Sequence, residues 1–207
     1  MGSKLKDKNV RHDKFYKMAK KENYASRAVY KLKEINKKYK FLKKGATVLD
    51  LGAAPGSWTQ YSQEEVGVNG KVVAIDLLPL QIQPASQTVF IQSDIYETTS
   101  EQFIELAEGK FDVILSDMAP NTTGNRFTDA VRSADLVMKI LDFVPDLLND
   151  KGFLVAKIFR GHDFDATLKE TKHLFKKTKV IKPESSRSES KELYIVAWEK
   201  RPKRLDF

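Results

Sequence analysis

The stretch from Val48 to Trp58, VLDLGAAPGSW, decides the fold. It starts as a short apolar run ending in an acid, the pattern of a buried parallel strand that reaches the edge of its sheet. Gly52 and Gly56 let a ligand approach the main chain closely, because glycine has no Cβ. A helix is predicted to begin near Ser57, with its unpaired first N–H groups facing the same turn. The stretch therefore predicts a strand, a ligand-binding turn and a helix.

The spacing of the glycines indicates the kind of ligand. A dinucleotide turn has the pattern G-x-G-x-x-G, whose glycines seat a pyrophosphate. Here Ala53, Ala54 and Pro55 interrupt that spacing. A turn of this type suits a cofactor without phosphate, and S-adenosylmethionine is the obvious candidate. The alternative is an ordinary strand-to-helix turn that binds no ligand. The acids at the ends of the later strands favour the cofactor turn over this alternative.

Acids follow the predicted strands at equivalent positions. Strands are predicted at 48–51, 71–77, 88–92 and 111–116. Because ligands bind outside the carboxyl ends of strands in an open α/β sheet, acids at this edge indicate a binding site. We expect Asp76 to accept hydrogen bonds from ribose hydroxyls and Asp94 to accept one from an adenine amino group. The acids are Asp50, Asp76, Asp94 and Asp117.

The rest of the chain alternates between helices and strands. The residues around Phe15 and Tyr16 are lysine-rich, and we expect poor order there without RNA. Ser26 is expected to cap the helix that follows it. A loop at 121–125 is interpreted as a mobile segment, and Pro145 is expected to interrupt the long helix after it. Helices are predicted at 27–38, 58–66, 100–107, 128–149 and 164–175, and later strands at 152–158, 178–182 and 193–198.

Two lysines and a glutamate stand out in these elements. Lys157 is a charge inside an apolar strand, which is unfavourable without a partner or a function. Lys31 borders the apolar stripe of its helix, and from this position alone a lysine that extends to water is the simpler interpretation. Glu192 opens the last strand and is expected to face the ligand edge if that strand runs antiparallel to the strand of Lys157.

Composition bounds the class of protein. The 207 residues suffice for one α/β domain, which we place at 23–207, after a basic arm at 1–22. Without cysteine, the chain has neither disulfides nor thiolate metal ligands. The sequence also has no apolar run that approaches the roughly 20 residues of a membrane span, nor a signal peptide. We therefore expect a cytoplasmic protein without membrane contact or metal, and a monomer by default.

Positive charge is concentrated at the beginning of the chain. Residues 1–44 hold 16 of the 36 Lys and Arg residues but only 4 of the 28 Asp and Glu residues, a net charge of +12. The remaining 163 residues carry 20 basic and 24 acidic side chains, a net charge of −4. This asymmetry favours a polyanionic partner, most plausibly nucleic acid. A solubilising tail is the alternative.

Five motifs together resemble the FtsJ-type RNA ribose 2′-O-methyltransferases. The resemblance covers about residues 11 to 200 and keeps the motifs in order. It implies an α/β, Rossmann-like methyltransferase fold, with a seven-stranded, mostly parallel sheet, one antiparallel strand and helices on both faces. Ser57 departs from the glycine that many members have, a small change that we expect to be tolerated. The motifs are SRAVYKL (26–32), DLGAAPGSW (50–58), SDMAPN (116–121), VAK (155–157) and SKELY (190–194).

The resemblance also implies roles for individual residues. It implies a catalytic tetrad of Lys31, Asp117, Lys157 and Glu192, which would orient and deprotonate a ribose 2′-hydroxyl. Lys157 is expected nearest that oxygen, as a neutral base or as a charged group that stabilises the alkoxide. The S-adenosylmethionine site implied by the family, together with the turn analysed above, comprises Gly52, Gly56, Trp58, Asp76, Asp94 and Asp117.

The substrate is expected to be ribosomal RNA, with uridine as the target nucleoside and the large ribosomal subunit as the partner of the basic arm. The short chain favours this type over relatives that act on tRNA or mRNA caps. Methylation of tRNA by the same chemistry remains an alternative, as does a non-catalytic RNA-binding protein on a methyltransferase fold. A dinucleotide-dependent oxidoreductase would share Asp76 but lacks the glycine spacing.

Overall fold

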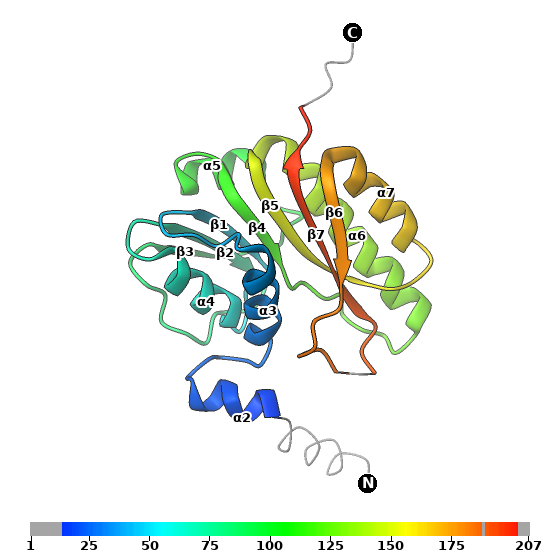
Figure 1. Cartoon of the computed structure of the whole chain (residues 1–207), viewed down its shortest axis with the longest axis horizontal. Helices are drawn as coiled ribbons and strands as arrows, with labels where there is room; N and C mark the ends of the chain where they lie inside the picture. Colours follow the sequence, from blue (N-terminus) through cyan, green and yellow to red (C-terminus); the bar gives the residue numbers. More distant parts are fainter. Residues whose placement is uncertain (1–13, 188, 203–207) are drawn as a thin grey trace.

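The computed structural model describes residues 14–187 and 189–202, and thus not the first 13 residues of the basic arm. Its elements alternate along the chain as the sequence predicts (Figure 1). The helices are Lys14–Lys21 (α2), Val29–Tyr39 (α3), Ser57–Val66 (α4), Ser100–Ala107 (α5), Arg126–Leu147 (α6) and Phe164–Leu174 (α7). The strands are Thr47–Leu51 (β1), Lys71–Asp76 (β2), Thr88–Gln92 (β3), Phe111–Ser116 (β4), Leu148–Phe159 (β5), Phe175–Ile181 (β6) and Glu192–Lys200 (β7).

One sheet of seven strands has the order β3-β2-β1-β4-β5-β7-β6. Strands β1 to β5 are parallel to one another, whereas β7 is antiparallel to both β5 and β6. The predicted mixed sheet with a single antiparallel strand is therefore confirmed. The strand order reverses between β1 and β4, and ligands bind at such a switch point, beyond the carboxyl ends of the strands.

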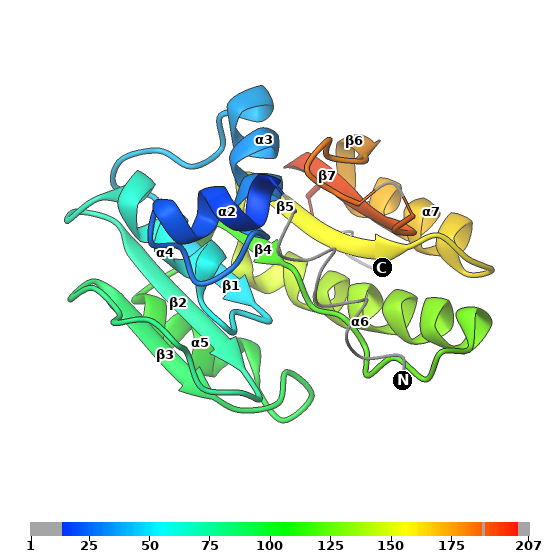
Figure 2. The same ribbon diagram turned by 90° about the horizontal axis from the view of Figure 1, so that it is seen from below.

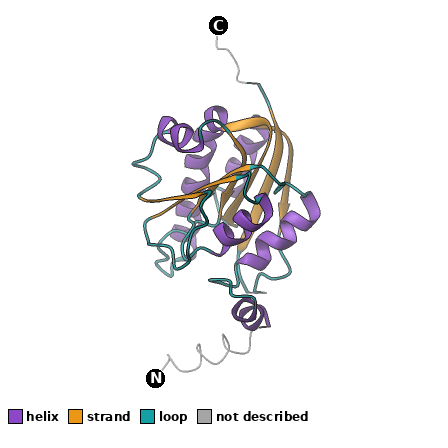
Figure 3. Ribbon diagram, turned by 90° about the vertical axis from the view of Figure 1, so that its left-hand side faces the viewer, coloured by secondary structure: helices purple, strands orange, loops and turns teal. Residues whose placement is uncertain are grey.

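Helices cover both faces of the sheet (Figure 3). Residues of α5, α6 and α7 pack on one face in the larger core cluster, which includes Phe103 and Val137. Residues of α3 and α4 pack on the other face in a second cluster, which includes Leu32 and Trp58. Because successive strand residues point to opposite faces, each central strand contributes to both clusters.

This alternation determines the face on which Lys157 lies. In β5, Leu154 and Ala156 belong to the cluster under α6, whereas Val155 belongs to the cluster under α3. Lys157 follows two residues after Val155 and so points to the α3 side, near the carboxyl edge. The β5–β7 register places Tyr194 directly opposite Lys157 on the same face, and Glu192 lies two residues before Tyr194.

Local contacts explain where the elements differ from prediction. Poor order was expected up to residue 22, but Lys14–Lys21 form α2, whose Ala19 is buried. Ser26 does not cap the next helix, which begins at Val29 without a side-chain cap. Its hydroxyl instead accepts a 3.2 Å hydrogen bond from Ala28 N, just before the helix, and bonds the hydroxyl of Ser57, 2.7 Å away. Pro145 does not interrupt α6, which continues to Leu147.

None of the helices in the part of the chain that the structure describes has the length and apolar character needed to cross a membrane.

Candidate active site

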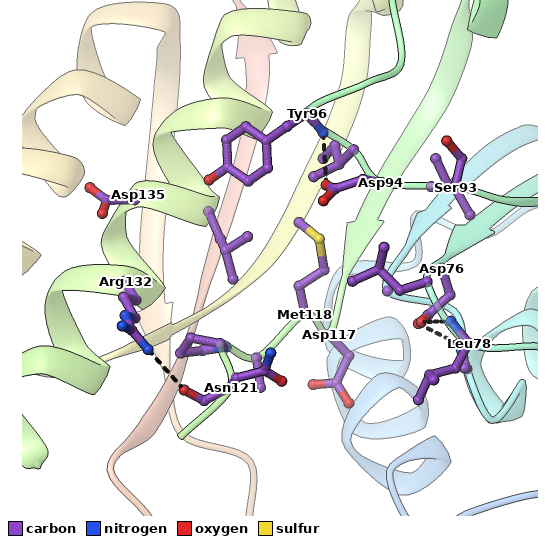
Figure 4. A pocket seen from close by; sticks show the side chains of 18 residues that line it. Asp76, Leu78, Ser93, Asp94, Tyr96, Asp117, Met118, Asn121, Arg132 and Asp135 are labelled. Atoms are coloured by element: carbon purple, nitrogen blue, oxygen red, sulfur yellow. Dashed lines mark hydrogen bonds between the residues drawn. The ribbon is translucent and has the colours of Figure 1, made fainter. Parts of the chain in front are cut away.

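A cavity of about 660 Å³ opens at the carboxyl edge of the sheet, among the loops that follow β1, β2, β3 and β4 (Figure 4). Gly52, Asp76, Asp94 and Asp117 all line it. Four of the six predicted cofactor residues, which are dispersed over 66 positions of sequence, thus share one cavity. Figure 2 views this edge of the molecule from below, with α3 and α6 on opposite sides of it.

Gly52 is a position where the backbone requires glycine. Its φ of +76° lies in the left-handed region, and an added Cβ would lie 2.5 Å from the side chain of Met118. The main chain can bend here only if residue 52 has no side chain. The glycine therefore brings the β1 turn against the β4 loop and leaves the wall of the cavity as bare main chain.

Main-chain donors hold the two acids of the cavity wall in place. Asp76 Oδ2 accepts a hydrogen bond of 2.8 Å from Ala54 N, and Oδ1 accepts one of 2.9 Å from Leu78 N. Asp94 Oδ1 accepts a hydrogen bond of 3.0 Å from Tyr96 N (Figure 4). A carboxylate oxygen can accept more than one bond. Both acids therefore retain acceptor capacity for ligand hydroxyl or amino groups.

Gly56 and Trp58, the other two predicted cofactor residues, do not line the cavity. Gly56 has a φ of +120° at the start of α4, where an added Cβ would lie 2.7 Å from Ile82. Trp58 is 2% exposed, and its Nε1 donates a 2.9 Å hydrogen bond to Ala28 O. Both residues lie behind the turn, where they fix its shape and join α4 to the segment that precedes α3.

Asp50 lies deeper still and is fully buried at the end of β1. Its Oδ2 accepts a 2.6 Å hydrogen bond from the hydroxyl of Thr59, and its Oδ1 has no partner within the described residues. Burial raises the pKa of Asp50 to about 7, although the bond from Thr59 opposes the shift. Unlike the three other acids of the edge, this group lies below the cavity.

Lys157 and Asp117 form a buried ion pair beside the cavity. Lys157 is 8% exposed, and its Nζ lies 3.0 Å from Asp117 Oδ1 and also donates to the main-chain oxygen of Asp117. Burial alone would raise the pKa of Asp117, but the charges of Lys157 and Lys31 outweigh it and hold that pKa below its usual value. The carboxylate is therefore ionised at neutral pH.

A second ion pair lies next to the first. Lys31 Nζ, on α3, is 2.7 Å from Glu192 Oε1, at the start of β7. Each of these side chains is 12% exposed. The four residues of the predicted tetrad come from α3, the β4 loop, β5 and β7, and the fold brings them together as two neighbouring pairs. The charge of Lys31 also acts on Asp117, which couples the pairs.

Tyr194 is a site residue that the reasoning from sequence did not single out. Its hydroxyl donates a 2.7 Å hydrogen bond to Asp117 Oδ1, and Lys31 Nζ lies 6.0 Å from the centre of its ring. Burial and the charge of Asp117 raise the pKa of the phenol well above its ordinary value. The alternation of β7 could have revealed it, because Tyr194 lies two residues after Glu192 on the same face.

A second cavity, of about 430 Å³, opens on the other side of the tetrad. Lys31 and Glu192 line it together with Arg27 and Arg187, whereas Asp117 lines the first cavity. The wall of the first cavity carries four aspartates and Arg132 among mostly apolar residues, and the wall of the second carries two arginines, one lysine and two glutamates. The two ion pairs therefore lie between these cavities. This arrangement can place a group bound on one side next to a group bound on the other.

Within residues 14–187 and 189–202, no three His, Cys, Asp or Glu side chains come together in a way that could bind a metal ion.

The sheet order and the cavity at its switch point define the class of Rossmann-like methyltransferases. The model of the family described as FtsJ-like methyltransferase matches residues 24–200. The chain therefore belongs to the FtsJ-like methyltransferase family, which confirms both the resemblance and the predicted methyltransferase.

Relatives and a solved structure agree with this assignment. "Ribosomal RNA large subunit methyltransferase E" of Desulfatibacillum aliphaticivorans is 44% identical over 201 residues, 97% of each chain. The protein of that name from Methanothermobacter thermautotrophicus is 45% identical, over 90% of this chain and 89% of its own. The crystal structure of a Plasmodium falciparum protein assigned as a ribosomal RNA methyltransferase covers 86% of this chain and 100% of its own, with a TM-score of 0.73 and 32% identity.

Proposed function

We propose that this protein transfers the methyl group of S-adenosylmethionine to a ribose 2′-hydroxyl, with a uridine of large-subunit ribosomal RNA as the target. The observation that carries the proposal is the position of the tetrad between two cavities. The names of the relatives, which refer to large-subunit ribosomal RNA, support the choice of substrate.

The residues of the first cavity fit S-adenosylmethionine. Asp76 would accept hydrogen bonds from the ribose hydroxyls, and Asp94 would accept one from the adenine amino group. Gly52 lines this cavity with main chain, and its lack of a Cβ allows Met118, which also lines the cavity, to approach it closely. When bound, this cofactor supplies a sulfonium methyl, an activated electrophile that needs little further activation.

The second cavity would receive the target nucleotide. Arg27 and Arg187 in its wall suit the phosphates on either side of the ribose, because a guanidinium pairs well with phosphate oxygens. A ribose between them would present its 2′-hydroxyl to Lys31, Glu192 and Lys157. Proximity and orientation are the main contributions that a site of this kind can make.

We assign Lys157 the central role, because its ammonium pairs with Asp117, the tetrad residue that lines the first cavity. The ammonium would donate a hydrogen bond to the 2′-oxygen and stabilise the negative charge that develops there. As the oxygen–methyl bond forms and the methyl–sulfur bond breaks, the hydroxyl proton leaves to water or to a carboxylate of the tetrad.

Basic residues at the start of the chain support a larger RNA contact. Helix α2 carries four lysines and no acid, and the last turn of α3 carries two lysines. We propose that they bind backbone phosphates of the ribosomal RNA or of the large subunit, with an affinity that falls steeply as salt rises. The protein would act as a monomer in the cytoplasm, the compartment in which a prokaryotic cell assembles its ribosomes.

The test is transfer of tritiated methyl groups to large ribosomal subunits, naked ribosomal RNA and tRNA, followed by mapping of the labelled nucleotide. We expect label on one ribose of the large-subunit RNA, a uridine. Label confined to tRNA, or label on a base rather than a ribose, would refute the proposed substrate. Absence of any transfer by a preparation that binds S-adenosylmethionine would refute the reaction.

A further inference from the structure

Helix α3 and the short segment before it contact the segment that leads into β7 at three places. Arg27, Lys31 and Glu34 are four and three residues apart, a spacing that places them on one side of a helix. Arg27 donates to the main-chain oxygen of Ser185, and Lys31 pairs with Glu192. Glu34 makes the third contact, and this residue has no role in the proposed reaction.

Glu34 binds two consecutive main-chain N–H groups. Its Oε2 accepts a 2.7 Å hydrogen bond from Glu184 N, and its Oε1 accepts a 2.9 Å bond from Ser185 N, about 150 positions further along the chain. Ser186 N closes the same turn with a 3.0 Å bond to Pro183 O. Successive N–H groups in a turn form a small concave anion site. Here the anion is a side chain of the protein itself, and it fixes a turn within a loop.

The turn places the hydroxyl of Ser186 against the tetrad. Ser186 Oγ donates a 2.8 Å hydrogen bond to Glu192 Oε1, the same oxygen that pairs with Lys31 Nζ at 2.7 Å. Although they lie in a loop, Ser185 is 1% exposed and Ser186 is 9% exposed. The hydroxyl and the ammonium thus converge on one carboxylate oxygen, within a packed segment.

We infer that Glu34 and Ser186 are positioning residues for methyl transfer, which hold the Glu192 carboxylate and, through it, Lys31. The inference rests on the proposed function, because it assigns its effect to the tetrad. Neither residue lines either cavity, so neither is expected to touch cofactor or RNA. They would act by restricting the rotation of two long side chains at the wall where the ribose binds.

The physical reason is the freedom of those side chains. A glutamate held by one lysine can rotate together with its partner, since both have several rotatable bonds. A second donor on the same oxygen leaves far fewer orientations, and the turn that carries this donor is itself fixed by Glu34. Small misplacements of an orienting group reduce turnover strongly even when substrates still bind.

The test compares Ser186→Ala, Ser186→Thr and Glu34→Gln with the wild type. Turnover is measured at saturating S-adenosylmethionine and RNA. It is expressed per cofactor-binding site, so that a smaller fraction of folded protein does not lower the measured kcat. We expect kcat to fall about tenfold in Ser186→Ala and in Glu34→Gln, with cofactor affinity unchanged. Ser186→Thr keeps the hydroxyl and should retain most of the turnover.

Two matched controls lie away from the turn. Glu199→Gln makes the same change in a carboxylate that pairs with exposed Lys177 near the far end of β7. Ser62→Ala removes a buried hydroxyl that has no hydrogen-bond partner in the structure. Both should keep the wild-type kcat. Should Ser186→Ala fail to fold, Glu34→Gln carries the same test.

A Glu192→Gln background separates this inference from the proposed function. In single-turnover assays, Ser186→Ala should lower the rate in the wild type and have little further effect in Glu192→Gln, because both act through one carboxylate. The inference would be overturned if Ser186→Ala and Glu34→Gln kept the wild-type kcat. It would also be overturned if Ser186→Ala lowered the rate as much in the Glu192→Gln background as in the wild type. Neither result would contradict the proposed function. Wild-type turnover of Glu192→Gln itself would overturn the role of the tetrad.

Discussion

Lys157 and Tyr194 face each other across the β5–β7 pair, and both contact Oδ1 of Asp117, Lys157 through an ion pair and Tyr194 through a hydrogen bond. In an antiparallel pair, residues directly opposite each other point to the same side of the sheet. One carboxylate at the end of β4 therefore receives an ammonium and a phenol from two neighbouring strands. This relationship sets the central group of the site beside the first cavity.

Lys157→Ala should lower methyl transfer by at least ~10²-fold, because it removes the ammonium that is assigned to stabilise the negative charge on the 2′-oxygen. Cofactor affinity should change little, since Lys157 is not part of the wall of the first cavity. Radiolabel transfer and calorimetric titration of the cofactor measure the two effects. Lys177→Ala, which removes an exposed lysine of β6, is the matched control. Near-wild-type turnover of Lys157→Ala would exclude Lys157 as the central group.

Tyr194→Phe should lower turnover less than Lys157→Ala does, by tenfold or less. Asp117 loses one neutral donor but keeps its ammonium partner, and the ring still fills its place between Trp58 and Lys31. A hydrogen bond to a charged group is worth about 1.5–3 kcal/mol, so some loss of stability should accompany the change. Chemical denaturation and turnover assays give both values. An inactive but fully stable Tyr194→Phe would indicate that the phenol itself takes part in the reaction.

Gly52→Ala should impair cofactor binding and destabilise the fold, because the new Cβ would lie 2.5 Å from Met118 in a left-handed backbone. Gly124→Ala is the matched control: its φ is +81°, but nothing lies within 4 Å of an added Cβ. The control should cost only the backbone strain, about 1 kcal/mol. Titration of the cofactor and thermal unfolding of both variants measure the contrast. Equal losses in the two variants would contradict the steric argument.

Asp50 should make the stability of the wild type depend on pH. Because its pKa is raised to about 7 in the folded state, the protonated acid stabilises the fold fully below the ordinary pKa of 3.8. That contribution decreases as pH rises and is lost above about 7, at ~1.4 kcal/mol for each unit of pKa shift. Asp50→Asn does not titrate, so its stability relative to the wild type should increase between pH 4.5 and 7.5. Urea denaturation at both values measures this, and a constant difference would exclude the raised pKa.

Several features of the site follow from local sequence. Strands β3 and β4 and helix α5 have the predicted bounds, because short apolar runs between turn residues identify buried strands without reference to the rest of the chain. The same local pattern placed Asp76, Asp94 and Asp117 at the ends of strands, and the fold brings them into one cavity. The family resemblance added the tetrad, including Lys31, which its own helix pattern did not single out.

Other features depend on contacts between distant segments, which no local pattern encodes. Trp58 and Gly56 lie behind the cofactor turn rather than in its cavity, because α3 and the loop at Ile82 pack against them. The turn that Glu34 holds lies about 150 positions away from it.

The sequence by itself thus determined the elements, the acidic edge and the class of chemistry, since each of these depends on residue type and spacing along the chain. Only the tertiary structure decided that the Lys31–Glu192 and Lys157–Asp117 pairs lie between two cavities, and that Tyr194 donates a hydrogen bond to Asp117. The physical reason is that side-chain partners are chosen by the packing of α3 on the sheet and by the register of β5 and β7, which bring residues together regardless of their separation in sequence.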